Sequence, residues 1–388
     1  MRWLRYGLWT LLVLVLVLGG SIGFLVATET GLLWGLQLAQ RVLPGTLSYE
    51  QIQGRIIGPL EIRTLRYQQD QLDFRLKHAE FDWQPAKLLS ATLHIDHLSV
   101  DGIELKLPPA AEEESETEPF TLSDIELPVQ VHIGDIHVRD IQVTPDGAEQ
   151  PIVIEQVKLQ ATTRDQTLII QTLAVAAPEG SLTADGRITP TGDYPLSVAL
   201  NGVLQHPQFG DLTLQSTVQG ELNDTMTVQV TTTGLAELKL TAEAREVLQQ
   251  PGWTAKLDLT VDDLSRFSPE LATGLAAKLE TQGTLQDFKV TGGINTELPE
   301  VGPVNADLDL SGNTQALRIG RLELKASQHP LSFTAQGDVD LVAQKVDIGA
   351  RWQAVAWPLT GDPQIQSPQG ELAVKGTPRI IARHSRRI

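Results

Sequence analysis

The segment Ile103-Glu104-Leu105-Lys106-Leu107 alternates strictly between apolar and polar residues. Because successive side chains of a β-strand point to opposite faces, this alternation is typical of a strand with one buried and one solvated face. From about Ile52 onward the same period of two recurs in short runs, which include Leu93-His94-Ile95-Asp96, Val129-Gln130-Val131-His132-Ile133, Leu238-Lys239-Leu240, Leu257-Asp258-Leu259, Leu308-Asp309-Leu310 and Leu322-Glu323-Leu324. We therefore expect an all-β body of antiparallel strands.

Turn-forming residues separate most of these runs at short intervals, which favours hairpins and short loops. A loose repeat of polar residue, Gly, any residue and apolar residue occurs at Asp185-Gly186-Arg187-Ile188, Gln219-Gly220-Glu221-Leu222, Gln282-Gly283-Thr284-Leu285 and Gln336-Gly337-Asp338-Val339. In a strand such a glycine indicates a bulge or a close backbone approach. Three short segments favour helix instead: Pro85–Leu89, Val247–Gln250 and Pro269–Leu279.

Composition excludes several classes of function. The 388 residues contain no cysteine, so a disulfide scaffold, a thiol nucleophile and a cysteine-ligated metal are ruled out. The formal charge of −18 argues against nucleic acid as the main partner, because phosphate contacts need clustered cations. The chain has no HExxH, GxSxG, P-loop or dinucleotide-binding motif, and the histidine pairs His94/His97 and His132/His137 each fall on opposite faces of a strand. We expect no catalytic site, no cofactor and no metal.

The amino terminus carries a membrane signal. Residues Tyr6 to Thr28 are uncharged, and Leu8 to Leu18 are almost wholly Leu and Val. A run of about 23 residues at 1.5 Å per residue spans the hydrocarbon core of a bilayer. Arg2 and Arg5 precede the run and Glu29 follows it, so the positive-inside rule places the amino terminus in the cytoplasm.

A cleaved signal peptide is the alternative. The apolar run continues past Gly19-Gly20-Ser21, and this favours an uncleaved anchor. The candidate membrane-anchor residues are Leu8, Leu11, Leu14, Leu18, Phe24 and Trp34.

A second helix is expected after the anchor, with Thr30 as its cap and an end at Pro44-Gly45. Its leucines recur at helical spacing, and Trp34 is an aromatic residue typical of a membrane interface. The segment either lies on the membrane surface or covers the core of the first domain, and both can hold at once.

The expected organisation has six parts. They are an anchor over residues 1–28, an amphipathic helix over 29–47, a first β segment over 48–109, an acidic loop over 110–119, β-groove repeats over 120–376 and a basic tail over 377–388. The acidic loop lacks the spaced Asp and the Gly of a calcium loop and is expected to be a disordered surface segment. The unpatterned tail suggests a truncated reading frame or a fragment.

An ordered series of short motifs resembles a known family. The motifs are Glu29-Thr30-Gly31-Leu32, Val42-Leu43-Pro44-Gly45, Gln53-Gly54-Arg55 through Gly58-Pro59-Leu60, Leu65-Arg66-Tyr67, His97-Leu98-Ser99-Val100-Asp101-Gly102-Ile103, Trp352-Gln353, Trp357-Pro358-Leu359-Thr360-Gly361 and Ser367-Pro368-Gln369-Gly370-Glu371-Leu372. Together they resemble the amino-terminal portion of the TamB family, inner-membrane subunits of the translocation and assembly module of Gram-negative bacteria, within the AsmA-like group. The resemblance covers roughly Met1 to Gly376.

The resemblance implies a long curved sheet, folded like a taco shell, with an apolar groove. It implies a single-pass inner-membrane protein whose periplasmic body carries phospholipid between the inner and outer membranes and supports outer-membrane biogenesis. The candidate groove-lining residues are Leu238, Leu240, Leu257, Leu259, Leu308, Leu310, Leu322 and Leu324.

Two other functions remain open. The family also fits an assembly factor for outer-membrane β-barrel proteins and autotransporters, in which sheet edges bind client strands. The domain of the family that meets the outer-membrane partner TamA is expected to lie outside this chain, which puts that contact in doubt. The third alternative is an anchored β-sandwich that binds glycans.

Overall fold

A computed structural model of the chain describes residues 27–70, 72–107, 124–148, 150–206, 210–266, 273–298, 301–357 and 365–376. The predicted anchor with Leu8, Leu11, Leu14, Leu18 and Phe24, the acidic loop and the basic tail lie outside these residues. Within the described part of the chain, no helix has the length and apolar character needed to cross a membrane. The described residues form two compact units, which meet in the sequence between Thr191 and Gly192.

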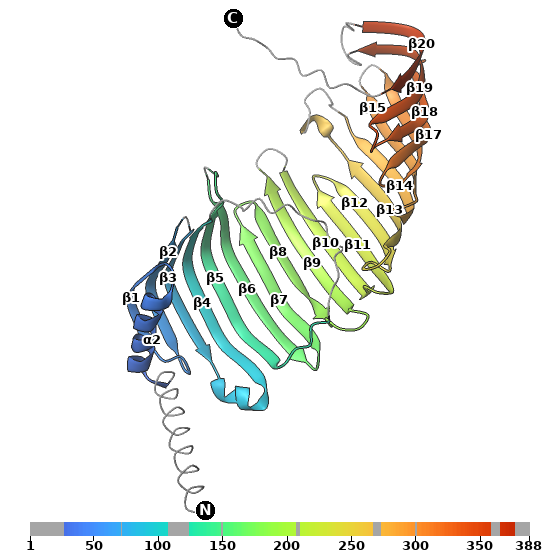
Figure 1. The fold of residues 1–388 in the computed structure, drawn as a ribbon. Helices are drawn as coiled ribbons and strands as arrows, with labels where there is room; N and C mark the ends of the chain where they lie inside the picture. Colours follow the sequence, from blue (N-terminus) through green and yellow to red (C-terminus); the bar gives the residue numbers. More distant parts are fainter. Residues whose placement is uncertain are drawn as a thin grey trace, which may run out of the picture. The chain divides into compact units, whose positions relative to one another are not determined.

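The described residues of the first unit form the α-helix α2, a short 3-10 helix and an eight-stranded sheet (Figure 1). Its elements are α2 (Glu29–Val42), β1 (Thr46–Gly54), β2 (Leu60–Gln69), β3 (Leu72–Trp83), the 3-10 helix η1 (Pro85–Ser90), β4 (Thr92–Lys106), β5 (Gln130–Thr144), β6 (Ile152–Arg164), β7 (Thr167–Ala177) and β8 (Gly180–Ile188). Strands that follow one another in the chain are neighbours in the sheet.

One pairing in this sheet is parallel, so the expectation of antiparallel strands throughout was wrong there. Strands β4 and β5 run side by side in the same direction, from Thr92 opposite Gln130 to Lys106 opposite Thr144. The chain therefore returns through residues 107–129 to the end of the sheet where β4 began, and a parallel pair needs a connection of this length. Alternation in a half-buried strand is the same for both directions, which is why the sequence pattern did not distinguish them.

The second unit is a twelve-stranded sheet in which every pairing is antiparallel. Its elements are β9 (Pro195–His206), β10 (Gly210–Glu221), β11 (Thr225–Gly234), β12 (Glu237–Arg245), β13 (Gly252–Val261), η2 (Leu264–Arg266), β14 (Leu275–Thr284), β15 (Phe288–Leu298), β16 (Gly302–Gly312), β17 (Ala316–Ala326), β18 (Ser332–Asp340), β19 (Lys345–Trp357) and β20 (Ile365–Gly376). The prediction of an all-β body is confirmed within each unit, and most connections are short, apart from residues 107–129 between β4 and β5. Figure 1 shows each sheet as curved and open.

The three predicted helical segments had different outcomes. The first is confirmed as the 3-10 helix Pro85–Ser90. The segment Val247–Gln250 forms a turn. The third prediction was wrong, because Leu275 to Leu279 belong to β14, where Leu279 lies opposite Leu257. The helix-favouring Ala and Lys residues of this segment yield to pairing with two neighbouring strands.

The repeated glycines mark close backbone approaches, as their position in the repeat predicted. A Cβ on Gly283 would lie 2.2 Å from the carbonyl oxygen of Asp287, and one on Gly337 would lie 2.1 Å from that of Asp347. Both glycines also have positive φ angles, 137° and 153°. Only glycine satisfies both conditions at these positions.

Helix α2 covers part of the first sheet. Its cap is Thr28 rather than the predicted Thr30, since the Gly31 amide donates to Thr28 Oγ1 at 3.0 Å. The helix packs against β1, and the side chain of Leu32 on the helix and that of Ile52 on β1 are both buried. The burial of Leu32 and the contact with β1 favour the alternative in which the helix covers a core, and the membrane-surface position stays a prediction.

Apart from the two helices on the first sheet, neither sheet has a second layer among the described residues. Every substantial contact between described elements joins neighbouring strands, except for α2 on β1 and η1 on β4. No large described side chain is fully buried. A compact cluster of buried side chains lies beside the ends of β16 and β18 and contains Val301, Val304 and Leu331. Most apolar strand residues are thus only half-buried, which leaves an extended apolar surface.

Candidate apolar binding face

Strand register brings the predicted groove residues together. In the β12–β13 pair, Leu238 lies opposite Leu259 and Leu240 lies opposite Leu257. Residues directly opposite each other in an antiparallel pair point to the same face of the sheet. The four leucines therefore form two adjacent rows on one face.

These rows continue across all twelve strands of the second unit. The row through Leu240 runs, from β9 to β20, through Leu200, Ser216, Val230, Leu240, Leu257, Leu279, Gly292, Leu308, Leu322, Ala335, Ala350 and Leu372. The row through Leu238 runs through Gly202, Leu214, Thr232, Leu238, Leu259, Ala277, Ile294, Ala306, Leu324, Phe333, Trp352 and Gly370.

A third row lies on the other side of Leu240 and contains Val198, Val218, Val228, Ala242, Ala255, Thr281, Val290, Leu310, Ile319, Gly337, Ile348 and Val374. We call the surface formed by these three rows the apolar face. All eight leucines predicted as groove-lining residues lie on it. A one-residue β-bulge at Gly320 keeps Leu310 and Ile319 in register with the rest of the row.

The few polar residues of the apolar face are small, and one is satisfied by its own hairpin. The Thr232 hydroxyl donates to the carbonyl oxygen of Ala236 at 2.7 Å and accepts from the Leu238 amide at 3.1 Å. Its hydrogen-bonding capacity is thus used within the protein. The Thr232 position therefore does not interrupt the apolar character of its row.

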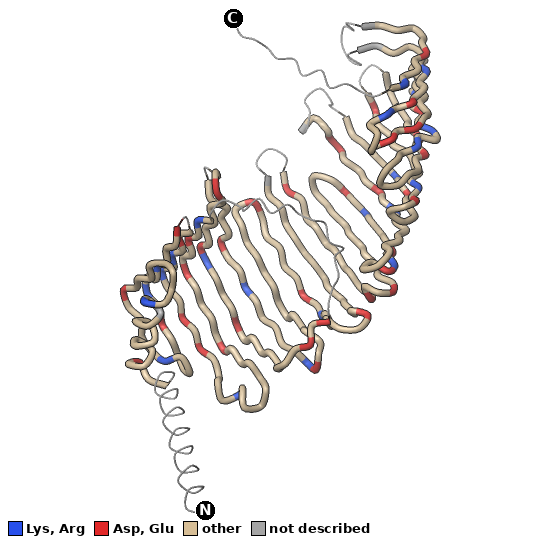
Figure 2. Tube along the Cα trace, viewed as in Figure 1, with Lys and Arg blue, Asp and Glu red and all other residues tan. Residues whose placement is uncertain are grey.

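The opposite face of the same sheet is charged. Lys256 and Glu280 lie opposite each other with Nζ and Oε1 2.8 Å apart, and Asp347 and Lys375 do so with a separation of 2.7 Å. Figure 2 shows Lys, Arg, Asp and Glu spread along the strands of this unit. Such exposed pairs stabilise little, but they keep this face solvated and specify the register.

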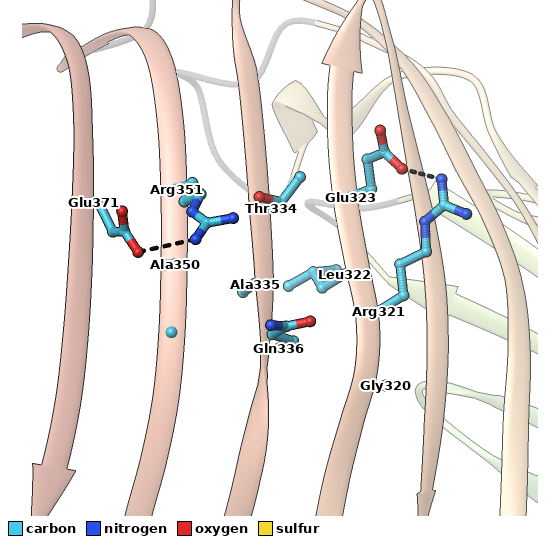
Figure 3. Close-up of a pocket in the computed structure, with 11 residues that line it drawn as sticks. Gly320, Arg321, Leu322, Glu323, Thr334, Ala335, Gln336, Ala350, Arg351 and Glu371 are labelled. Atoms are coloured by element: carbon cyan, nitrogen blue, oxygen red, sulfur yellow. Dashed lines mark hydrogen bonds and ion pairs between the residues drawn. The ribbon is translucent and has the colours of Figure 1, made fainter.

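A hollow of about 180 Å³ in the second unit has two ion pairs in its lining and is a poor candidate for an anion site (Figure 3). Arg351 donates to Glu371 at 3.1 Å, and Arg321 is paired with Glu323. Lys325 and then Arg321 hold the pKa of Glu323 below its usual range through hydrogen bonds. Both arginines that line the hollow are thus already neutralised.

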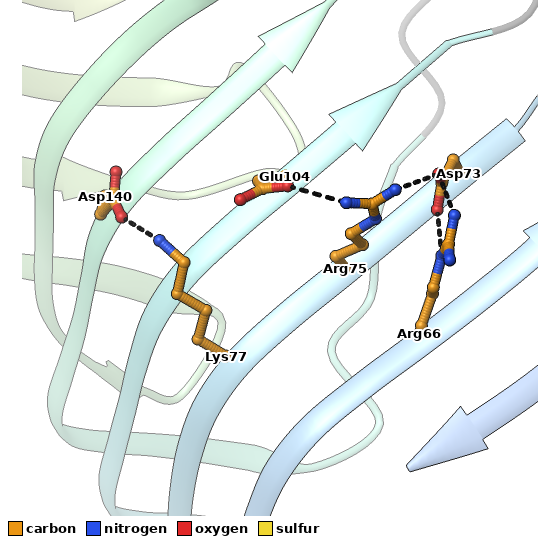
Figure 4. A network of polar contacts seen from close by, with 6 residues as sticks. All are labelled: Arg66, Asp73, Arg75, Lys77, Glu104 and Asp140. Atoms are coloured by element: carbon orange, nitrogen blue, oxygen red, sulfur yellow. Dashed lines mark hydrogen bonds and ion pairs between the residues drawn. The ribbon is translucent and has the colours of Figure 1, made fainter. Parts of the chain in front are cut away.

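The first unit has a charged network of its own (Figure 4). Asp73 accepts from Arg66 at 2.8 Å and from Arg75 at 3.0 Å, and Lys77 reaches Asp140 at 2.8 Å. The hydrogen bond from Arg66 is the main reason that the pKa of Asp73 lies well below its usual range. The network joins β2, β3 and β5 and indicates a structural role.

An apolar row also crosses the first unit, and the sequence analysis did not include it among the candidates. It contains Ile52, Ile62, Ala79, Val100, Val138, Val157, Val175 and Leu182. The same alternation that identified Leu238 and Leu240 could have identified it. The parallel pair β4–β5 carries this row through Val100 and Val138 without a break.

The histidines meet in an arrangement that their spacing does not reveal. His94 and His132 stack across the parallel pair with ring centroids 4.2 Å apart, and His97 Nδ1 lies 3.2 Å from Asp135 Oδ2. In the described ranges, no group of three or more His, Asp or Glu residues is arranged to hold a metal ion.

Each unit is an open, single-layered sheet with one apolar and one charged face. This architecture is that of a scaffold protein that offers an extended apolar surface. A profile of the TamB N-terminal domain family matches residues 17–150 and 121–341. The match covers most of the chain, so the chain belongs to the TamB family, and the resemblance seen in the sequence is confirmed. The search of solved structures found no match. Membership indicates a role in outer-membrane biogenesis within a family of transport and assembly proteins.

Proposed function

We propose that the chain is an inner-membrane-anchored periplasmic protein that carries phospholipid along its apolar face towards the outer membrane. The observation that supports this most strongly is the set of three continuous rows across β9–β20, with no second layer of described residues over them. In a protein whose apolar face was covered by a second layer, the leucines of these rows would be buried.

The apolar face suits acyl chains in particular. Each CH₂ group buried against Leu, Ile or Val side chains gains about 0.8 kcal/mol, and no polar contact to the chain is needed. A phospholipid can therefore lie with its tails on the rows while its headgroup stays in water. Each row contains one residue from every strand, and neighbouring strands are about 4.8 Å apart. A lipid that moves across the sheet therefore meets similar surroundings at each strand.

Lipid bound to the purified full-length chain tests this proposal. We expect mass spectrometry of extracted lipid to find less phospholipid per protein for Leu240→Asp than for the unchanged chain, because a carboxylate on the central row is costly beside an acyl chain. Thr241→Asp is the matched control, since the neighbouring residue belongs to the charged face. Both variants keep the amino-terminal segment and any lipid bound to it, so equal lipid content in the two would refute the proposal.

A role in assembling outer-membrane β-proteins is the second candidate. In the described part of the chain β20 pairs only with β19, which leaves one edge of β20 without a partner strand. Such an edge can accept a client strand, and Leu372 and Val374 on the apolar face of β20 are exposed. Cross-links from β20 to unfolded outer-membrane proteins, without copurifying phospholipid, would favour this function. A protein with this function would also contact a TamA-like partner.

A further inference from the structure

Exposed apolar side chains gather at one corner of the first unit. Ile56 and Ile57 form the tip of the β1–β2 turn, with exposed fractions of 39% and 36%. Leu88 and Leu89 on η1 are 44% and 94% exposed. Four large aliphatic residues in two loops are costly to leave in water, and a cluster of this kind marks an interaction site.

The two loops belong to the same corner because the strands bring them together. Strand β2 starts at Leu60, which lies opposite Phe81 near the end of β3. Two residues later the Trp83 indole donates to the carbonyl oxygen of Ile56 at 2.6 Å, and η1 begins at Pro85. We call residues 55–57 and 87–89 the apolar corner.

The short helix η1 holds its leucines outward in a fixed turn. Its last turn is closed by Ala91, whose φ of 53° is left-handed and whose amide donates to Leu88 O at 2.9 Å. The Ser90 hydroxyl donates to Lys87 O at 2.8 Å. These hydrogen bonds fix the backbone of the turn. The exposed side chains of Leu88 and Leu89 are therefore available to enter an apolar phase.

Each pair of apolar residues is preceded by a cation. Arg55 and Lys87 are exposed, and neither forms an ion pair with another residue in the described ranges. Residues 55–59 and 85–91 contain no Asp or Glu, although the chain as a whole has a formal charge of −18. Exposed aliphatic side chains with a cation beside them suit a surface that has an apolar interior and anionic headgroups, such as a phospholipid bilayer.

The apolar corner lies at the end of the first unit where α2 begins. Gln40 Nε2 donates to Leu47 O at 3.0 Å, so α2 runs back along β1 and its amino-terminal end points towards the β1–β2 turn. In Figure 1 this end of α2 and η1, between β3 and β4, lie at the same end of the unit. The uncharged sequence from Tyr6 to Thr28 comes immediately before α2.

We propose that the apolar corner docks on the lipid bilayer, with Ile56, Ile57, Leu88 and Leu89 in the headgroup–acyl boundary and with Arg55 and Lys87 on anionic lipid phosphates. This contact holds the first sheet against the membrane independently of what the apolar face of the second unit carries. It therefore goes beyond the proposed lipid transport and stands or falls separately from it.

The cysteine-free chain allows a direct test in the full-length protein. An environment-sensitive fluorophore on Leu89→Cys or Ile57→Cys is compared with one on Val342→Cys, in vesicles of phosphatidylethanolamine and phosphatidylglycerol that carry nitroxide-labelled lipid. Val342 is the matched control because it is 72% exposed beside Leu341 in a turn of the second unit. We expect at least about threefold stronger quenching at positions 57 and 89 than at 342.

The cations supply a second measurement. The double variant Arg55→Gln and Lys87→Gln should lower the quenching at Leu89→Cys, as should replacing phosphatidylglycerol by phosphatidylcholine or raising the salt concentration. Position 57 provides an independent probe if the label at 89 disturbs η1. Quenching at 57 and 89 no stronger than at 342, or quenching that is insensitive to lipid charge, would overturn the proposal.

Discussion

Leu240 on β12 lies directly opposite Leu257 on β13, and both side chains stand on the same face of the second sheet. The residues on either side of Leu240, Lys239 and Thr241, pair with Asp258 and Lys256 on the other face. This single register relationship, repeated from strand to strand, produces one apolar and one charged surface.

Helix α2 has an inner and an outer apolar side with different predicted roles. Leu32 is 7% exposed, whereas Trp34 and Leu38 are 56% and 49% exposed. Leu32→Ser should lower the free energy of unfolding by about 2–4 kcal/mol, because it removes buried apolar volume and buries a hydroxyl. Trp34→Ser with Leu38→Ser should leave it within about 1 kcal/mol and weaken vesicle binding instead. Thermal unfolding and vesicle flotation separate the two, and equal destabilisation would show that the outer side also packs against protein.

Two adjacent glycines on β15 should respond very differently to substitution. A Cβ on Gly292 would lie 2.0 Å from the Lys278 carbonyl oxygen, and the φ of this residue is 155°. Gly292→Ala should therefore cost at least about 2 kcal/mol, from strain and loss of local pairing. Gly293→Ala is the control, because its new Cβ would be 3.6 Å from the nearest atom, the Ala306 carbonyl oxygen. Chemical denaturation measures both, and similar losses would contradict the close approach of β14 and β15.

The Asp73 network should make the first unit sensitive to acid. Arg66, followed by Arg75, lowers the pKa of Asp73 in the folded state, so its stabilisation is present above the unfolded pKa of about 3.9 and is lost as the pH falls towards the folded value. Asp73→Asn should cost about 1.5–3 kcal/mol near pH 7 and progressively less below about pH 4.

Melting curves at several pH values measure this effect. Asp338→Asn is the control, because Asp338 and its partner Arg318 are 61% and 69% exposed, and it should cost less than about 1 kcal/mol. A loss for Asp73→Asn that does not change with pH would show that the carboxylate charge is not what stabilises the network.

The charged face should tolerate exchange of its charges. Lys256 and Glu280 are 70% and 64% exposed, so Lys256→Glu should change the free energy of unfolding by less than about 1 kcal/mol. The exchanged pair Lys256→Glu with Glu280→Lys should recover most of that change, because the opposite charges again face each other. Differential scanning calorimetry suffices for the comparison. A loss above about 2 kcal/mol would mean that this face is packed against something.

Alternation in the sequence was sufficient to predict the strands and the face on which Leu238 and Leu240 lie. It was not sufficient to predict the direction of pairing. The strands that contain Leu105 and Val143 form a parallel pair, but each would show the same alternation in an antiparallel pair. The helix predicted near Leu279 failed for a related reason. Local propensity favoured helix, but the opposing Leu257 is distant in sequence and decides the structure.

Contacts between strands were the least accessible to prediction. The stack of His94 on His132 depends on the parallel register, and the bulge at Gly320 depends on how β17 meets β16 and β18. Neither leaves a pattern within its own strand. The same holds for the apolar corner, because the β1–β2 turn and η1 reach the same end of the unit only after β2 and β3 pair.

Photo-crosslinking along the central row can show which face of the second sheet contacts lipid. A benzophenone side chain at Leu240 or Leu257 is compared with one at Thr241 or Lys256, which occupy the same two strands but the opposite face. In cells, we predict that the first two positions capture phospholipid and that the second two do not. Capture of protein alone at Leu240 and Leu257, or equal lipid capture on both faces, would contradict the claim that the apolar face carries lipid.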